Sequence, residues 1–301
     1  MFKKFVTVII ISIIFYFLLS HLIKNWNKIP FDNLHFNIIN LVISIIFLFI
    51  NFLIFVEGWR TILIKLGDSI DFKRAFWIMS ASQTAKYVPG GIWFVLGRIH
   101  LGKETNLGAE KIGLSVIIET MLTFLVGIII FIFSISFSGY AKLNNFIYVI
   151  PALVFFLILL YPPLLSRLAN FCLKIVKRPV VNLAISYSEL LNLSIYFLGL
   201  WIAQIIGFYF LINSIYSIDI NRITNLAATY TLSWMSGFIV IFAPGGLGVR
   251  EGTMSLLLSS FIPTPLAIAI SFLSRVWITV FEIVVFFIGF TVHKFSRKNN
   301  F

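Results

Sequence analysis

Long apolar runs, separated by short polar segments, recur along the whole chain. A helix that crosses a bilayer core needs about 20 predominantly apolar residues, and six uninterrupted runs have about that length or more. The pattern predicts transmembrane helices over 5–23, 38–56, 112–137, 146–165, 190–212 and 265–292. The weakly hydrophobic stretches 57–74 and 167–188 are predicted to be loops.

Two further apolar runs, 72–101 and 223–261, are each interrupted near the middle by a Pro-Gly-Gly triplet. Proline and glycine end helices, so each run predicts two half-helices joined by a break. The arm 91–101 would be about 16 Å long, roughly half the thickness of the hydrocarbon core. Backbone groups freed by such a break need protein or water partners, so broken helices in membranes usually line a site.

The positive charges favour hairpins that enter and leave on one side of the membrane. With the N-terminus inside and both interrupted runs re-entrant, 15 basic residues lie at inner ends and loops and 4 in outer loops. If both runs crossed, the split would be 11 to 8. The positive-inside bias therefore predicts re-entrant hairpins, with both termini in the cytoplasm. Four basic residues are left inside membrane segments: Lys86, Arg98, Arg250 and Arg275.

These elements predict an all-α polytopic membrane protein with six spans and two re-entrant broken-helix hairpins, in a single membrane domain (1–301). Each half then has the order span, span, hairpin, span, with an odd number of crossings, so the second half is inverted relative to the first. The first repeat would cover 1–140, with the hairpin 72–101. The second would cover 141–301, with the hairpin 223–261. The two hairpin tips are expected to meet near the midplane.

The composition excludes a soluble globular protein, and it gives no indication of a nucleic acid partner, a disulfide, a metal or a cofactor. Hydrophobic residues make up 60% of the chain, charged residues 11%, and the mean hydropathy is +1.02. The net charge of +12 fits the anionic inner leaflet of a cell (inner) membrane and requires no nucleic acid partner. The single cysteine, Cys172, excludes an internal disulfide, and no histidine has metal-ligand spacing, so we expect no metal and no cofactor. Tryptophans and many tyrosines are expected in belts at headgroup level.

The interrupted runs carry the candidate chemistry. A half-helix that starts in the membrane presents N–H groups and a positive dipole end, which attract phosphate. The candidate phosphate-binding residues are Lys86, Arg98, Arg250 and Arg275, although each of the first three could also be an interfacial anchor. The hairpin-tip residues are Pro89, Gly90, Gly91, Pro244, Gly245, Gly246 and Gly248. Glu119, Glu251 and Glu282 are predicted either to neutralise these cations or to carry protons for coupling. The sequence does not decide between the two roles. Glu251 is expected to complement the dipole of its half-helix.

Two stretches of the chain resemble a known family. The stretch 83–91 (QTAKYVPGG) with Arg98, and the stretch 243–252 (APGGLGVREG) with Arg275 and Glu282, are similar to the flippase-like family of the lysylphosphatidylglycerol synthase transmembrane region. Members of that family include the flippase half of multiple peptide resistance factors, which moves aminoacylated phosphatidylglycerol between leaflets, and stand-alone proteins thought to serve envelope lipids. We find no soluble aminoacyl-transferase domain in the 301 residues, so the resemblance does not imply the synthase reaction.

The sequence thus predicts a transporter that moves an anionic phospholipid or a polyprenyl-phosphate-linked envelope intermediate between leaflets. A small-anion carrier, or a non-transporting subunit of an envelope polysaccharide or lipid assembly complex, are the alternatives. We expect no enzyme activity, because the chain has no His-Glu-x-x-His motif and no pair of aspartates within a span. Envelope-biosynthesis enzymes are possible partners, and the oligomeric state is left open.

Overall fold

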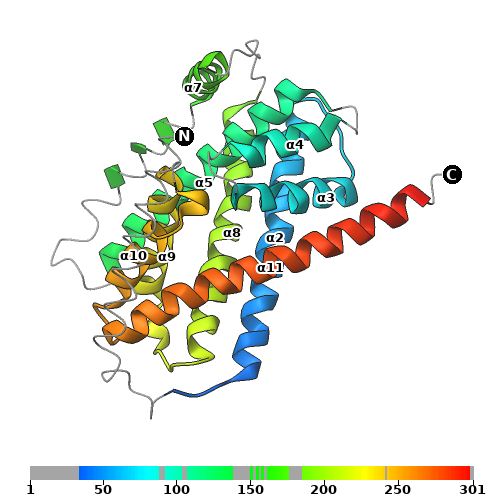
Figure 1. Cartoon of the computed structure of the whole chain (residues 1–301). Coiled ribbons are helices and arrows are strands. Elements are labelled where there is room, and N and C mark those ends of the chain that lie inside the picture. The colour runs from blue at the N-terminus through cyan, green and yellow to red at the C-terminus, as the bar shows by residue number, and fades with distance from the viewer. Residues whose placement is uncertain are drawn as a thin grey trace, which may run out of the picture.

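The structure, a computed structural model, is helical throughout the part of the chain that it describes (Figure 1). The described residues are 34–87, 92–103, 107–137, 150–151, 154–155, 157–158, 161–175, 185–240 and 243–298. The one β-bridge among them, between Leu34 and Tyr216, belongs to no strand. The predicted all-α class is therefore confirmed.

Four helices are long and apolar enough to cross a membrane: α2 (Ile38–Lys65), α5 (Ala109–Phe137), α8 (Tyr187–Asn213) and α11 (Thr264–Lys298). They coincide with four of the six predicted spans, and they make the protein a multi-pass membrane protein. The predicted span 5–23 lies outside the described residues, and the span 146–165 is described only in part, over 150–151, 154–155, 157–158 and 161–165.

Each interrupted run forms two short helices that pack against each other. The first run contains α3 (Phe72–Gln83), the 3₁₀ turn η3 (Thr84–Tyr87) and α4 (Trp93–Lys103). The second contains α9 (Ile223–Ile239), the 3₁₀ turn η5 (Pro244–Gly246) and α10 (Val249–Leu258), and it follows the short turn η4 (Ile220–Arg222). With 17 residues, α9 is about 26 Å long, which still falls short of the roughly 30 Å hydrocarbon core.

The two predicted loops are partly helical, which corrects the prediction for 57–74 and 167–188. Helix α2 continues to Lys65 because its polar residues pair along one face, with Glu57 and Arg60 2.7 Å apart, while Trp59 on another face is fully buried. Helix α7 (Pro162–Ile175) covers the start of the second stretch, with Arg167 and Lys174 both in exposed positions. When the polar residues of a helix lie on one face, they interrupt the apolar run in the sequence, so a search for uniformly apolar runs does not detect the helix.

Helices α2 and α8 run antiparallel side by side and form the frame of the molecule (Figure 1). At one end, called the Lys65 end here, Lys65 and Glu189 form an ion pair of 2.6 Å. At the opposite Asn213 end, the Asn40 side-chain amide donates to the Asn213 carbonyl at 2.9 Å. The start of one helix meets the end of the other, so these two contacts mark the two opposite ends of the helix pair. The remaining helices are attached at one or the other of these ends.

The first hairpin, α3 to α4, leaves from and returns to the Lys65 end. Asp68, just after α2, accepts hydrogen bonds from the backbone N–H of Gly108 at 3.0 Å and from the Lys111 ammonium at 2.6 Å. Gly108 and Lys111 lie at the beginning of α5, after the hairpin. The chain therefore enters and leaves this hairpin at one place.

The second hairpin, α9 to α10, is attached at the Asn213 end. The backbone N–H of Ile218 donates to the Asn213 side chain at 3.1 Å, which ties the segment before α9 to the end of α8. Arg222, at the start of α9, places its guanidinium 6.0 Å from the centre of the Phe261 ring, just after α10. The two hairpins thus begin and end at opposite ends of the α2 and α8 frame.

Several aromatic residues expected in headgroup belts lie in the core instead. Trp59 donates its indole N–H to Ser115 Oγ at 2.8 Å, and Trp201 donates to the Thr123 carbonyl at 3.0 Å. Both indoles are buried between helices, and Tyr230 is buried as well. The belt assignment is wrong for these residues, because a buried partner for the indole N–H replaces the wet interface. On α11 the exposed apolar side chains instead include Val276, Val280, Ile283, Val284 and Phe287.

We predict that Gly246→Ala destabilises the second hairpin. Gly246 has φ +72°, and a Cβ there would lie 2.7 Å from both the Cα and the carbonyl oxygen of Gly237 in α9. The left-handed conformation and the backbone clash together should cost about 3 kcal/mol. The matched control is Gly252→Ala in α10, where a Cβ would meet nothing within 4 Å. Thermal unfolding of both variants in detergent is the measurement, and equal stabilities would contradict the prediction.

Candidate functional site

A cavity of about 400 Å³ lies between the two hairpins and the long helices. Its walls come from the long helices α2, α5, α8 and α11, from the short helices α3, α4, α9 and α10, and from the turns η3 and η5. The charged residues that line it are Lys86, Glu119, Arg250, Arg275 and Glu282. Charges from both interrupted runs and from two spans therefore face one space.

The residues beside the two Pro-Gly-Gly triplets meet at this cavity. Gly245, Gly246 and Gly248 all have positive φ, which glycine adopts without strain. A Cβ on Gly245 would lie 3.6 Å from the ring of Tyr87, so the end of η3 rests against η5. Of the predicted tip residues, Pro89, Gly90 and Gly91 lie outside the described residues, while the backbone of Pro244 forms part of η5.

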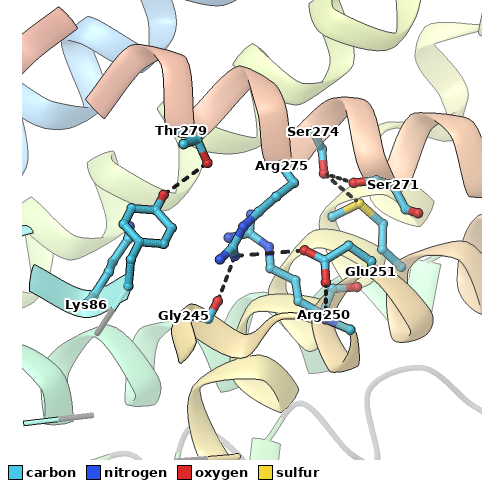
Figure 2. Close-up of polar contacts among 12 residues, drawn as sticks. Lys86, Gly245, Arg250, Glu251, Ser271, Ser274, Arg275 and Thr279 are labelled. Carbon is cyan, nitrogen blue, oxygen red and sulfur yellow. Dashed lines mark hydrogen bonds and ion pairs between the residues drawn. The ribbon is translucent and has the colours of Figure 1, made fainter. Parts of the chain in front are cut away.

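Arg275 on α11 reaches the second hairpin (Figure 2). Its Nη1 donates to the Gly245 carbonyl at 2.6 Å and lies 3.8 Å from Glu251 Oε1. Its guanidinium also lies 5.4 Å from the centre of the Tyr87 ring, so the same side chain touches residues of both hairpins. The Nη2 atom is buried and has no hydrogen-bond partner among the described residues.

Arg250, in the first turn of α10, packs on α9. Its Nη2 donates to the Tyr230 hydroxyl at 2.6 Å, and its guanidinium lies 5.1 Å from the centre of the Tyr230 ring. The side chain is buried, yet no carboxylate forms an ion pair with it within the described part of the chain. Its Nε has no hydrogen-bond partner there either. An unneutralised guanidinium therefore borders the cavity.

Lys86 and Tyr87, the last residues of η3, both bind Glu282 on α11. Lys86 Nζ bonds to Glu282 Oε1, and the Tyr87 hydroxyl donates to Glu282 Oε2 at 2.8 Å. The Tyr87 hydroxyl is also 3.1 Å from the Thr279 hydroxyl; Figure 2 shows Thr279 on the same helix as Arg275. Arg275, Thr279 and Glu282 are four and seven residues apart, so they lie on one face of α11. That face contacts η3 of the first hairpin and η5 of the second.

Glu251 neutralises the start of α10. Its Oε2 accepts the backbone N–H of Gly248 at 2.6 Å, and its side chain is buried. A carboxylate in this position complements the positive end of the helix dipole. The Gly248 N–H is already occupied by this bond, so the anion-binding part expected of this helix start falls to the side chains of Arg250 and Arg275.

Arg98 lies behind the cavity wall. It is fully buried, donates from Nη1 to Glu119 Oε2 at 2.6 Å, and has its guanidinium 5.1 Å from the centre of the Trp59 ring. Glu119 lines the cavity, and Arg98 does not. This position does not favour the direct phosphate contact predicted for Arg98; it makes Arg98 the counter-charge of Glu119.

Three residues that line the cavity have a buried hydrogen-bond donor without a partner in the described part of the chain. Among its lining residues, Arg250 Nε, Arg275 Nη2 and Gln204 Nε2 are buried atoms without a partner within the described residues. All three are N–H donors. A buried donor without a partner costs free energy, so these atoms indicate a ligand rich in acceptor oxygens. No group of histidine, cysteine or acidic residues in the described part of the chain could hold a metal ion.

Sequence reasoning missed three neutral residues of this site. Tyr87 stands next to Lys86 in the first motif and could have been found from that position. Tyr230 and Gln204 occupy apolar helices, where a single polar residue gives no signal of the direction in which it points. Their place at the cavity follows only from the packing of α8 and α9.

Comparison with known proteins gave one family match. A family model described as the lysylphosphatidylglycerol synthase TM region matches residues 5–285, which is most of the chain. A search of curated proteins gave no match. The match includes both hairpins and all five charged residues that line the cavity.

We predict that Arg98 and Glu119 stabilise the fold only as a pair. Arg98→Met alone, or Glu119→Leu alone, should cost roughly 3 to 5 kcal/mol, because each leaves a buried charge without its partner. The double variant Arg98→Met/Glu119→Leu should recover most of that loss. Unfolding in detergent measures the three variants, and additive losses in the double variant would contradict the prediction. Glu57→Gln, which breaks a half-exposed pair, is the control and should cost less than about 1 kcal/mol.

Proposed function

We propose that this chain, which belongs to the family of the lysylphosphatidylglycerol synthase TM region, moves an anionic lipid between the leaflets of a membrane. The family indicates a membrane lipid-related function. The observation that carries the more specific proposal is that Arg250, Arg275 and Gln204, which line one cavity between the two hairpins, each have a buried N–H donor without a partner among the described residues.

A lipid phosphate supplies what those donors lack. Its oxygens accept several hydrogen bonds at once, and a guanidinium fork binds two of them. Arg250 and Arg275 lie on different helices and border the same space, so one phosphate can accept from both. Burial of such a phosphate would satisfy donors that otherwise destabilise the empty site.

The rest of the cavity lining supports a lipid over a small inorganic anion, the second candidate. Aromatic and aliphatic side chains make up much of the wall, among them Phe52, Phe55, Trp234, Phe238 and Phe281. A carrier of a small anion gains nothing from such a wall, whereas acyl or polyprenyl chains do. We propose transport without chemical conversion of the lipid, with envelope-biosynthesis enzymes as its source or consumer.

We further propose that both hairpins are re-entrant and that they enter from opposite sides of an inner membrane, with cytoplasmic termini. The attachment of the first hairpin at the Lys65 end and of the second at the Asn213 end supports this topology. The contacts of Asp68 with Lys111 and of Arg222 with Phe261 support a return to the side of departure in each case. Alternating access to the cavity would then follow from movement of the hairpins against the long helices.

Translocation should depend on the cavity arginines. In liposomes with the purified protein, tail-labelled anionic phospholipids and polyprenyl phosphates should cross in a protein-dependent manner, measured by leaflet-selective quenching. Arg250→Ala and Arg275→Ala should each lower the initial rate by at least about tenfold, because each removes a charge-assisted contact to the phosphate. Arg222→Ala, at an exposed position outside the cavity, is the matched control and should keep the wild-type rate.

Two outcomes would contradict this proposal. Wild-type rates in both cavity variants would show that the arginines do not contact the lipid. Absence of movement of every lipid with folded protein would favour the small-anion carrier, which uptake of inorganic phosphate or sulfate into the same liposomes would test, or the assembly subunit.

Cysteine labelling tests the topology. In a Cys172→Ser background, single cysteines at the exposed positions Asp71 and Lys103 flank the first hairpin, and cysteines at Asn221 and Ser260 flank the second. An impermeant maleimide added to intact cells should label the second pair and leave the first pair unlabelled. Labelling of only one member of either pair would mean that the hairpin crosses the membrane.

A further inference from the structure

The positive and negative side chains around the cavity nearly balance, which leaves a small net positive charge. Arg98 pairs with Glu119, and Lys86 pairs with Glu282. Arg275 lies 3.8 Å from Glu251, so that this arginine is partly neutralised. Only Arg250 has an uncharged partner, the Tyr230 hydroxyl. Among the described residues, the site therefore carries one uncompensated positive charge.

One excess charge matches a ligand with one negative charge. A lipid phosphodiester brings a single charge and leaves a neutral site, while a phosphomonoester above its second pKa of about 6 brings two. In a desolvated site an uncompensated charge is expensive, so a second negative charge would need a second free cation. Lys86 is the nearest candidate, and Glu282 occupies it.

We propose that Glu282 determines the headgroup charge that the cavity accepts, selecting singly charged lipid phosphodiesters over doubly charged phosphomonoesters. This inference rests on the proposed lipid transport. By holding Lys86, Glu282 keeps the fixed positive charge of the site at one. The Tyr87 hydroxyl fixes the other carboxylate oxygen at 2.8 Å, so Glu282 stays in place beside Lys86.

The position of Glu282 suits this part. Its carboxylate is mostly buried, with 14% of the side chain exposed, and it lines the same cavity as Arg250 and Arg275. Glu119 cannot replace it as the selector, because the fully buried Arg98 already neutralises Glu119 from behind the wall. A change of charge at position 282 therefore changes the net charge of the cavity directly.

The test compares two lipids with identical labelled tails, phosphatidylglycerol and phosphatidic acid, in proteoliposomes at pH 8, where phosphatidic acid is doubly charged. Wild-type protein should move phosphatidylglycerol faster. Glu282→Gln should lower the ratio of the two rates by about tenfold, since it frees Lys86 for the second phosphate charge. Lys86→Gln should raise the ratio, because it removes a positive charge.

The double variant Lys86→Gln/Glu282→Gln is the decisive one. It removes one charge of each sign, so it should return the ratio to the wild-type value, whereas a merely structural role for the pair would not change the ratio in opposite directions. Glu57→Gln, which removes a carboxylate outside the cavity, should leave the ratio unchanged. If Glu282→Gln does not fold, Lys86→Gln and the double variant still give the two comparisons.

The outcomes separate this inference from the function it rests on. Equal or faster movement of phosphatidic acid by the wild type, or an unchanged ratio in folded and active Glu282→Gln and Lys86→Gln variants, would overturn the selection by Glu282 and leave lipid transport intact. If the wild type moved neither phosphatidylglycerol nor phosphatidic acid, the proposed transport would be overturned, and the inference with it.

Discussion

The need to pair buried charges organises this protein. An ionised side chain at membrane depth is costly unless another group neutralises it, and the chain resolves this with contacts between elements that are far apart in sequence. Glu282 binds Lys86 across 196 positions, and Glu119 binds Arg98 across 21. Each pair joins a short broken helix to a long one. The same electrostatic penalty thus fixes where the hairpins dock, and among the described residues it leaves Arg250 at the cavity without a carboxylate partner.

The packing of the second hairpin shows why glycine is required there. Gly246 and Gly237 bring the backbones of η5 and α9 so close that position 246 has no room for a methyl group, and this approach puts the Gly245 carbonyl within reach of Arg275. Glu251 then neutralises the start of α10 through the Gly248 N–H. Backbone geometry and side-chain charge therefore act together, since the tight turn positions the carbonyl that orients the arginine.

The sequence revealed the parts with a strong local signal. Uniformly apolar runs identified α2, α5, α8 and α11, and the Pro-Gly-Gly triplets identified the second break at η5. Arg250, Arg275, Lys86 and Glu282 stood out because charge is rare in such segments. Side-chain direction had no local signal. The sequence could not tell that Arg98 is buried beside Glu119 and does not line the cavity, or that Tyr230 and Gln204 do line it, because tertiary packing alone decides which face of an apolar helix meets which neighbour. The amphipathic α7 escaped detection for a related reason: its apolar residues share a stripe and form no run.

Helix α11 crosses the molecule diagonally (Figure 1), and one of its faces touches η3 through Thr279 and Glu282 and η5 through Arg275. The two hairpins are attached at opposite ends of the α2 and α8 frame, and this one helix forms polar contacts with η3 of the first hairpin and η5 of the second. A change of tilt in α11 would therefore act on both hairpins at once. The two halves of the protein are mechanically coupled through this shared helix.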